Sequence, residues 1–548
     1  MALTEVPVPE LVLARRERAA GFTLPAPSPL RIAAVAAAGL VVVPLLAVVV
    51  LALQPAEAAV SLRLLARYAA STAALAVLVG LGSTALGAVA AWLVVMHRFP
   101  GRGLFEWALA LPLAAPAYVL AYAYADLLDV AGPVQTWLRG AGLDPSFLQA
   151  RSLPGAALIL SAAFYPYVYL TARAAFLSQS VCALDAARTL GASAREAFWR
   201  VALPLARPAL AAGAALAVME TLADYGAVTH LGVQTLTTGV VRAFTSYGSA
   251  EAAARLSLTL LGAAALLLWI ERFGRRGETY GASTVRWRDL PQTPLRPLSA
   301  WGATAFCTTL LAGALLLPAV WLAVRAGEAS PDLPRLLRAG STSLGLGVAG
   351  AVLTVSLAIA IAFGAPRNRA WAAWPARLAS LGYATPGAVM AIGLLGPAAL
   401  LWRHGGAPAA SAAAALGLLL YAYGARLTAA ALEPIDAGLT RVTPSMDRAA
   451  RMLGETEAGA LRRVHAPLAK GALWTAALLV FVDVLKELPA TLILRPFNFD
   501  TLAVQASNYA ADERLAQAAP PALLLVALAV GPVILLSRRI ARSRPGQG

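Results

Sequence analysis

Apolar runs of about 20 residues recur along this chain and constrain its fold more than any other feature. A run of about 20 residues matches the thickness of the hydrocarbon core of a bilayer. A segment inside lipid must satisfy its own backbone hydrogen bonds, so each run is predicted to be a helix. The twelve runs lie near residues 32–53, 69–96, 104–129, 155–177, 209–230, 254–271, 299–324, 340–364, 378–402, 410–433, 472–494 and 517–537. We therefore predict an all-α integral membrane protein with about twelve spans.

The chain is also a tandem duplication, because a polar interval between two apolar runs returns with a constant offset of 263 residues. Internal repetition at a fixed period indicates a repeated structural unit. The landmarks of the first copy are Asp185, Ala186, Ala187, Gly191, Val201, Leu203 and Pro204. Those of the second copy are Arg448, Ala449, Ala450, Gly454, Val464 and Pro467. Two matched copies between matched apolar runs make an ordinary connecting loop improbable.

This duplication divides the chain into two six-helix halves. The predicted units are an N-terminal arm at 1–31, half one at 32–271 with its core repeat from about 69, an Arg-rich linker at 272–298, half two at 299–537 with its core repeat from about 340, and a tail at 538–548.

Each repeated interval is predicted to form two short helices joined by a sharp corner. Gly191 and Gly454 stand where a left-handed residue closes a helix. Ser193 then caps the next helix, with Glu196 three residues later as a capping box. Thr456 repeats the cap in the second copy.

At these residues the sequence resembles the transmembrane subunits of ABC importers. Their cytoplasmic loop carries Glu-Ala-Ala, three residues, Gly, nine residues, Ile, any residue and Leu-Pro. The first copy has Asp185 in place of Glu and Val201 in place of Ile. The second copy has Arg448 in place of the acid and Ala466 in place of Leu. The resemblance implies that this loop docks into a cleft of a separate ATPase subunit.

Arginine distribution predicts the orientation of the chain. If the N-terminus is cytoplasmic, the inside segments hold 29 of the 44 Lys and Arg residues, as the positive-inside rule expects. Both repeated intervals, the linker and both termini then face the cytoplasm. The net charge of +16 follows from topology and contact with lipid, so it does not imply a nucleic-acid partner.

Two pairs of acidic residues lie inside predicted spans at equivalent positions of the two halves. The offset matches Glu220 with Asp483 and Asp224 with Glu487. Each pair is spaced i, i+4 and is predicted to share one helix face. Acids at membrane depth are costly and normally face a cavity or a partner. Two interpretations have equal weight: the acids line the pathway, or they lie near the outer ends and are neutralised by Lys486.

Tyrosines cluster in two other predicted spans, 104–129 and 155–177, and two tyrosines of the chain are candidates for the pathway. Most tyrosines near span ends act as anchors at the membrane interface, which is the expectation for the clusters at 118–124 and 165–169. Tyr165 and Tyr225 are in addition proposed to contact a cargo transiently.

Catalytic motifs are not apparent. A Walker A loop needs a Lys after Gly, and the two lysines follow Ala469 and Leu485. We therefore expect no cofactor in this chain and no ATPase activity of its own, with ATP used by partner subunits. The four histidines show no ligand spacing, so no stably bound metal is expected.

More narrowly, the chain resembles the ferric iron permeases among these importers. The segments that carry this likeness are 121–129, 165–169, 219–226 and 486–501. The resemblance implies a bacterial inner-membrane protein that works with two copies of a cytoplasmic ATPase and an extracytoplasmic solute-binding protein. Fused thiamine permeases share the length and the duplicated loop, so thiamine is an alternative cargo. A secondary transporter also has two six-helix repeats, but it has no use for the paired loop.

Overall fold

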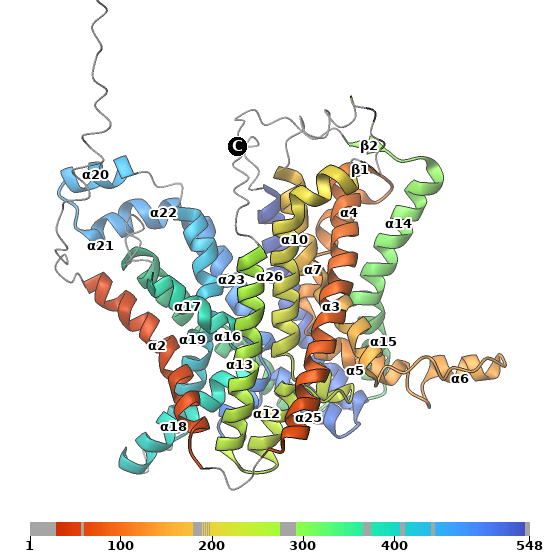
Figure 1. The fold of residues 1–548 in the computed structure, drawn as a ribbon, viewed down its shortest axis with the longest axis horizontal. Helices are drawn as coiled ribbons and strands as arrows, with labels where there is room; N and C mark the ends of the chain where they lie inside the picture. The colour runs from red at the N-terminus through yellow and green to blue at the C-terminus, as the bar shows by residue number, and fades with distance from the viewer. Residues whose placement is uncertain are drawn as a thin grey trace, which may run out of the picture.

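The computed structural model describes residues 29–55, 60–178, 189, 191, 193, 196, 198–274, 292–364, 374–405, 411–439 and 444–542. Regular structure in these residues is almost entirely helical, as the apolar runs predict (Figure 1). Half one contains α2 (Pro29–Ala52), α3 (Leu62–Met96), β1 (His97–Arg98), α4 (Arg102–Ala108), η1 (Leu111–Ala114), α5 (Ala117–Leu127), α6 (Pro133–Gly140), α7 (Leu153–Ser178), η2 (Phe198–Ala202), α10 (Leu203–Ala223), α11 (Gly226–His230), α12 (Leu236–Thr245) and α13 (Ala250–Gly274). After β2 (Thr293–Pro294), half two contains α14 (Pro297–Leu311), η3 (Ala312–Leu316), α15 (Leu317–Gly327), α16 (Leu333–Gly364), α17 (Trp374–Ala384), α18 (Gly387–Gly405), α19 (Ala412–Leu439), α20 (Pro444–Met452), α21 (Glu457–Ala460), η6 (Leu461–His465), α22 (Ala466–Leu468), α23 (Lys470–Lys486), α24 (Pro489–Leu494), α25 (Leu502–Ala511) and α26 (Leu515–Arg542).

The helices of the described residues are consistent with the predicted twelve spans. Nine helices are long and apolar enough to cross a membrane, and three bent helix pairs raise the number to twelve if each pair is one span. The predicted continuous spans 104–129 and 378–402 are wrong in detail. The first bends by 89° between 102–114 and 117–127, and the second bends by 109° between 374–384 and 387–399.

Proline explains both breaks. Pro112 lies in η1 and Pro116 directly precedes α5, while Pro386 lies between α17 and α18. Proline lacks the backbone N–H that would continue a helix, and its ring clashes with the preceding turn. The predicted run 472–494 also divides, because α23 ends at Lys486 and Pro489 begins α24.

The first span of each half packs against the other half. Helix α2 contacts α16, α17 and α18 of half two, whereas α15 contacts α5 of half one and α26. Ala37 and Val41 of α2 accordingly belong to the apolar cluster of half two. The two halves are therefore interlocked. The linker separates them in the sequence, but their helices do not pack as two separate bundles.

Close helix packing in half one depends on small residues, as is usual inside membranes. Helix α3 packs along α7 and approaches it closely at Gly87. A Cβ atom at Gly87 would lie 2.7 Å from Cβ of Val168 and 2.8 Å from the carbonyl oxygen of Tyr165. A larger residue would therefore push α3 away from α7 and open the core.

Segments that the arginine distribution predicts to share one side of the membrane lie at one end of the molecule. Helices α20, α21 and α22 lie at this end together with β1 and β2, whereas α12 and α25 lie at the opposite end (Figure 1). The two strands join the loop after α3 to the end of the linker through parallel pairing, with His97 opposite Thr293.

Candidate functional site

The described part of the first repeated interval has the predicted corner. Gly191 adopts a φ of +86°, in the left-handed region that favours glycine. The amide of Ser193 donates to Glu196 Oε2 at 2.9 Å, and the amide of Glu196 donates to Ser193 Oγ at 3.3 Å, which confirms the capping box. The carboxylate of Glu196 accepts from both the amide and the hydroxyl of Ser193, and these two hydrogen bonds lower the pKa of Glu196 below its ordinary value. Asp185, Ala186 and Ala187 lie outside the described residues.

The second interval repeats this geometry. Gly454 has a φ of +80°, and the amide of Gly459 donates to the Thr456 hydroxyl at 3.1 Å. Arg448 and Ala449 are exposed on α20, whereas Ala450 is buried. Two apolar side chains at the end of α20 face outward, Met452 with 89% and Leu453 with 84% exposure. The corner therefore presents an apolar edge that no described residue covers.

The continuation of each interval into the next span differs in exposure between the two copies. Val201, Leu203 and Pro204 are half-buried around the start of α10. Val464 is half-buried in η6, and Pro467 is exposed in α22.

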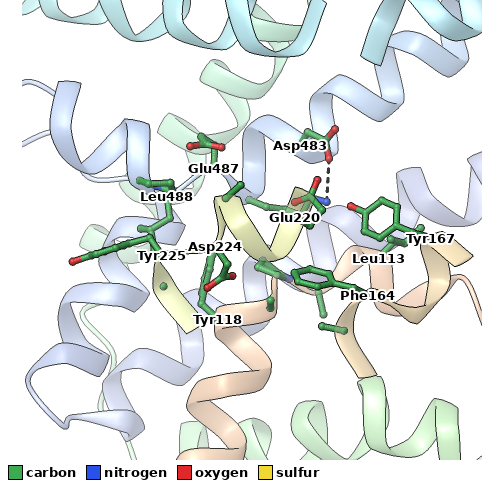
Figure 2. Close-up of a pocket in the computed structure, with 18 of the residues that line it drawn as sticks. Leu113, Tyr118, Phe164, Tyr167, Glu220, Asp224, Tyr225, Asp483, Glu487 and Leu488 are labelled. Carbon is green, nitrogen blue, oxygen red and sulfur yellow. Dashed lines mark ion pairs between the residues drawn. The ribbon is translucent and has the colours of Figure 1, made fainter. Parts of the chain in front are cut away.

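A small cavity lies between the two halves, with a volume of about 90 Å³. Its walls come from η1, α5, α7 and α10 of half one and from α17, α19 and α23 of half two. Its polar and aromatic lining residues are Tyr118, Phe164, Tyr167, Glu220, Asp224, Tyr225, Tyr383, Arg426, Asp483, Lys486 and Glu487. The four acids that the duplication relates thus meet in one cavity, and all four are labelled in Figure 2.

The second acid of each pair lies beyond its helix, which corrects the prediction that both acids of a pair lie on one helix face. Asp224 ends α10 with φ −69° and ψ 129°, and Glu487 ends α23 with φ −68° and ψ 118°. Each carboxylate then accepts from the next short helix. Asp224 Oδ1 accepts the amides of Ala227 at 2.9 Å and Val228 at 3.1 Å. Glu487 Oε1 accepts the amide of Ala490 at 3.2 Å. The two halves therefore build the same helix break at the cavity.

Two basic residues neutralise part of the acidic charge. Lys486 Nζ lies 3.0 Å from Asp483 Oδ1, and Arg426 forms an ion pair with Glu487. The ion pair between Lys486 and Asp483 agrees with one part of the second interpretation, in which Lys486 neutralises an acid of its own span. Arg426 is a residue whose role the sequence did not predict, because it has no acid within one turn of its own helix. No ion pair or hydrogen bond among the described residues holds the side chain of Glu220, which lines the cavity half-buried.

The two tyrosine candidates lie differently from the prediction. Tyr165 does not line the cavity, because its side chain is fully buried in the apolar cluster that includes Cys307. Tyr225 lines the cavity, but its hydroxyl is turned away from Glu220 and Asp483 (Figure 2). Tyr167 and Tyr383 are lining residues that the sequence did not identify. The expected interfacial anchoring is wrong for Tyr118, Tyr122, Tyr165 and Tyr169, which are at most 4% exposed.

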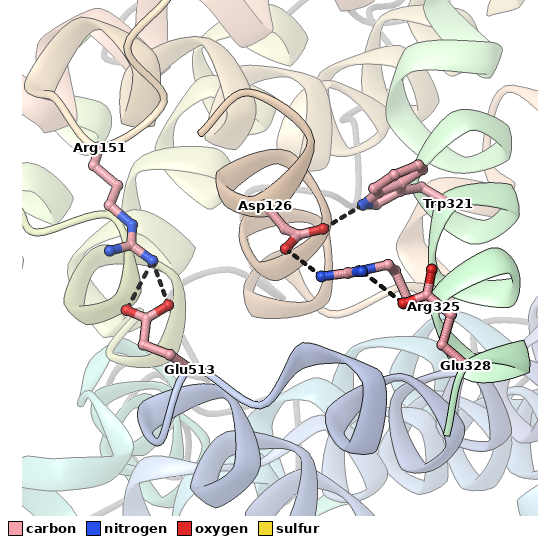
Figure 3. A network of polar contacts seen from close by, with 6 residues as sticks. All are labelled: Asp126, Arg151, Trp321, Arg325, Glu328 and Glu513. Atoms are coloured by element: carbon pink, nitrogen blue, oxygen red, sulfur yellow. Dashed lines mark hydrogen bonds and ion pairs between the residues drawn. The ribbon is translucent and has the colours of Figure 1, made fainter. Parts of the chain in front are cut away.

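Further ion pairs join the two halves outside the cavity (Figure 3). Arg151 Nη2 donates to both oxygens of Glu513, at 2.9 and 2.8 Å. Asp126 accepts from Arg325 at 3.0 Å and from the indole of Trp321 at 2.9 Å. These contacts tie α15 and the start of α26 to half one.

Among the residues that the structure describes, no group of three or more His, Cys, Asp or Glu side chains is placed to hold a metal ion. The arrangement offers carboxylates in excess of bases, which suits a weak and transient contact with a cation.

Known proteins resemble this chain over one half or over both. Residues 83–276 match the family model described as the binding-protein-dependent transport system inner membrane component. The Fe(3+)-transport system permease protein FbpB 2 of Haemophilus influenzae is 26% identical over 484 residues, which cover 86% of this chain and 90% of that protein. The sulfate transport system permease protein CysT of Escherichia coli is 30% identical over 200 residues, which cover 35% of this chain and 71% of that protein. The molybdenum transport system permease protein ModB of Escherichia coli is 29% identical over 207 residues, which cover 35% of this chain and 87% of that protein.

The two Escherichia coli relatives therefore correspond to about one half of this chain, whereas the iron relative runs through both halves. This agrees with the duplication in the sequence and with the repeated helix breaks at the cavity. The chain belongs to the family of binding-protein-dependent transport system inner membrane components, as a multi-pass permease with two fused halves.

Proposed function

We propose that this chain forms the translocation pathway of an importer for a hard cation, with ferric iron as its cargo. Membership of the family implies a solute-binding protein and an ATPase as partners. The observation that carries the cation assignment is the charge of the cavity. Four carboxylates face two bases, which leaves a formal charge of −2 if all six groups are ionised.

The negative charge of the cavity favours some of the cargoes named for the relatives over others. A cavity with excess negative charge attracts cations and opposes anions such as sulfate or molybdate. Hard cations prefer carboxylate and other oxygen ligands. Transport also requires weak contacts, because a site that binds tightly cannot release its ion. The match to the iron permease covers 90% of that protein and 86% of this chain, which supports ferric iron among the hard cations.

We infer that the two repeated corners dock onto two ATPase subunits in the cytoplasm. The exposed apolar side chains at Met452 and Leu453 suit burial against another protein. The arginine distribution supports a cytoplasmic location for both corners and both termini. ATP is bound and hydrolysed by these partners, and this chain contributes neither a cofactor site nor an ATPase site.

In the proposed cycle, a loaded solute-binding protein docks at the outer end and delivers its cation. ATP-driven closure of the partner subunits moves the two corners, and the motion switches the cavity from inward-facing to outward-facing access. The helix breaks after α10 and α23, at Asp224 and Glu487, support the idea that the cavity wall changes during this motion.

Neutralising the first acid of each pair tests the cation pathway. We expect the variant Glu220→Gln/Asp483→Asn to lose most uptake of radioactive ferric iron in cells, while expression, assembly with the ATPase and basal ATP hydrolysis persist. The matched control Glu328→Gln/Asp512→Asn removes one Glu and one Asp from exposed positions. Unchanged iron uptake in the cavity variant, or disassembly of its complex, would refute the proposal.

The docking role is tested at the two left-handed glycines. A β-branched residue in this conformation costs roughly 1–2 kcal/mol, so Gly191→Val and Gly454→Val should distort the corners and uncouple ATP hydrolysis from loaded binding protein. The effect should be larger at Gly191, because the second copy departs further from the family pattern. Gly142→Val is the matched control, since Gly142 has a φ of +76° in the loop after α6. Equal coupling in all three variants would contradict the docking role.

An organic cation such as thiamine is a second candidate, favoured by the aromatic lining. Tyr118, Phe164, Tyr167 and Tyr383 surround the cavity, and aromatic faces attract organic cations. The cavity volume of about 90 Å³ argues against thiamine as the cargo, because pockets for drug-sized ligands usually measure at least about 300 Å³. Parallel uptake of labelled thiamine and labelled iron decides between the two cargoes.

A further inference from the structure

The acids of the cavity are duplicated, but its bases are not. With the offset of 263, Arg426 corresponds to Ala163 and Lys486 corresponds to Ala223. All four of these positions line the cavity. Half one therefore contributes two acids and no base, whereas each acid of half two is paired with a base of its own half. Simple repetition does not explain why bases occur in half two alone.

The two bases are held differently. Arg426 pairs with Glu487, and the side chains of this pair are only 12% and 5% exposed. Its planar guanidinium fixes that carboxylate at the end of α23. Lys486 is the last residue of α23, directly before the backbone becomes extended at Glu487. Its side chain is 19% exposed and ends in a compact ammonium on a flexible stem. Lys486 is therefore the basic group that can move within the cavity.

The positive charge of Lys486 acts on the first acid of each half, Asp483 and Glu220. Its ammonium contacts Asp483 at 3.0 Å and interacts electrostatically with Glu220, which lies beyond ion-pair distance. Figure 2 shows Glu220 and Asp483 in the same region of the cavity, with the dashed line of this ion pair between them. A cation that enters the cavity meets the same two carboxylates.

We propose that the Lys486 ammonium is a tethered competitor that keeps the affinity of Glu220 and Asp483 for the cargo cation low enough for release. The inference rests on the proposed function in that the cargo is a cation. When the cargo arrives, it displaces the ammonium from Asp483. When the cargo leaves, Lys486 returns, so that two neighbouring carboxylates are not left without a counter-ion at membrane depth.

This arrangement accounts for the asymmetry of the bases. One tethered ammonium is enough for one cation-binding position between Glu220 and Asp483. A second ammonium, on a lysine in place of Ala223, would occupy the same position from the side of half one. Arg426 is unsuited to this role because it is engaged by Glu487 in a nearly buried pair. Lys486 is thus a positioning and specificity residue for transport.

Removing the charge of Lys486 tests the proposal on the purified complex with its ATPase in lipid nanodiscs. The probe is Tb³⁺, a hard trivalent cation whose luminescence is excited through nearby tyrosines such as Tyr167 and Tyr383. Lys486→Met should bind Tb³⁺ at least tenfold more tightly than the unmodified protein. In iron uptake, the same variant should lower both KM and kcat, because the cargo binds better and leaves more slowly. Lys486→Arg keeps the charge and should stay close to the unmodified protein in both assays.

The outcomes separate this inference from the proposed function. Tighter Tb³⁺ binding by Lys486→Met that disappears when Glu220→Gln/Asp483→Asn is added supports the competitor. Binding no tighter than in the unmodified protein overturns it, even if iron uptake still depends on Glu220 and Asp483. Tighter Tb³⁺ binding without iron uptake by any form of the protein refutes iron as the cargo but leaves the competitor intact. If neither Lys486→Met nor Lys486→Gln assembles, Lys486 is a structural ion-pair partner and the proposal is overturned.

Discussion

Breaking the ion pair between Arg426 and Glu487 should destabilise the protein strongly. The two side chains are 12% and 5% exposed, so Arg426→Leu leaves a carboxylate nearly buried without its cation. Removing one partner of a buried pair typically costs about 3–5 kcal/mol. The lower end, about 3 kcal/mol, applies here because Glu487 keeps the amide of Ala490 as a donor. Equilibrium unfolding of the purified protein in mixed detergent micelles measures this loss.

A double-mutant cycle separates the ion pair from the packing around it. Replacing both partners of a buried pair by apolar residues of similar volume is often neutral or stabilising, so Arg426→Leu/Glu487→Met should regain most of the stability that Arg426→Leu loses, with Glu487→Met as the second single variant of the cycle. Arg151→Ala is the matched control, because Arg151 and Glu513 are 42% and 68% exposed. An exposed pair contributes about 0–1 kcal/mol. A similar loss in Arg426→Leu and Arg151→Ala would refute the view that burial sets the strength of this pair.

Three further predictions follow from the ends and the core of the molecule. Single cysteines at Ser193 and Thr456 should resist an impermeant thiol reagent in intact cells, while a cysteine at Leu143 should react; the reverse pattern would overturn the orientation. Gly87→Val should lower the free energy of unfolding by about 1–3 kcal/mol, as overpacking does, and a stability equal to that of the unmodified protein in a thermal melt would show that α3 and α7 can separate freely. The hydrogen bonds that lower the pKa of Glu196 stabilise the corner above the ordinary pKa of a glutamate, and this contribution is lost as the pH falls through the lowered pKa. Hydrogen exchange at Ser193, corrected for its intrinsic rate, should therefore accelerate at low pH, and Glu196→Gln should remove that dependence.

The membrane spans could be predicted from the sequence because lipid leaves a backbone few alternatives. Apolar length was enough to place the helices, since every backbone group inside lipid must bond within its own segment. The breaks at Pro116 and Pro386 were not predicted as bends of 89° and 109°, because proline in a membrane helix also occurs as a mild kink. The direction of the chain after each break depends on packing partners. Gly387 is an example, because a Cβ there would lie 2.2 Å from Glu487 Oε1 of a distant segment.

The acids of the cavity could be identified because the duplication marks them twice. Single residues could not be assigned with the same certainty. Tyr165 and Tyr167 are two positions apart on one helix, and successive residues of a helix are about 100° apart around its axis. One of them therefore faces the cavity while the other is buried in the apolar cluster, and the sequence does not give the rotation of α7. Arg426 was missed for a related reason, because its partner Glu487 lies 61 residues away.

The unequal charge of the two cavity walls leads to a last prediction. On the side of half one, Glu220 and Asp224 face the cavity without a base, whereas Asp483 is held by Lys486. A cation should therefore be attracted most strongly toward α10, away from the axis that relates the halves. It follows that Glu220→Gln should reduce iron uptake more than Asp483→Asn does. A fully symmetric pathway predicts equal losses, whereas a path biased toward the unpaired acids of half one predicts a larger loss in Glu220→Gln. Initial rates of uptake at subsaturating iron, normalised to the amount of assembled complex, distinguish the two. Equal losses would mean that the bases of half two do not bias the path of the ion.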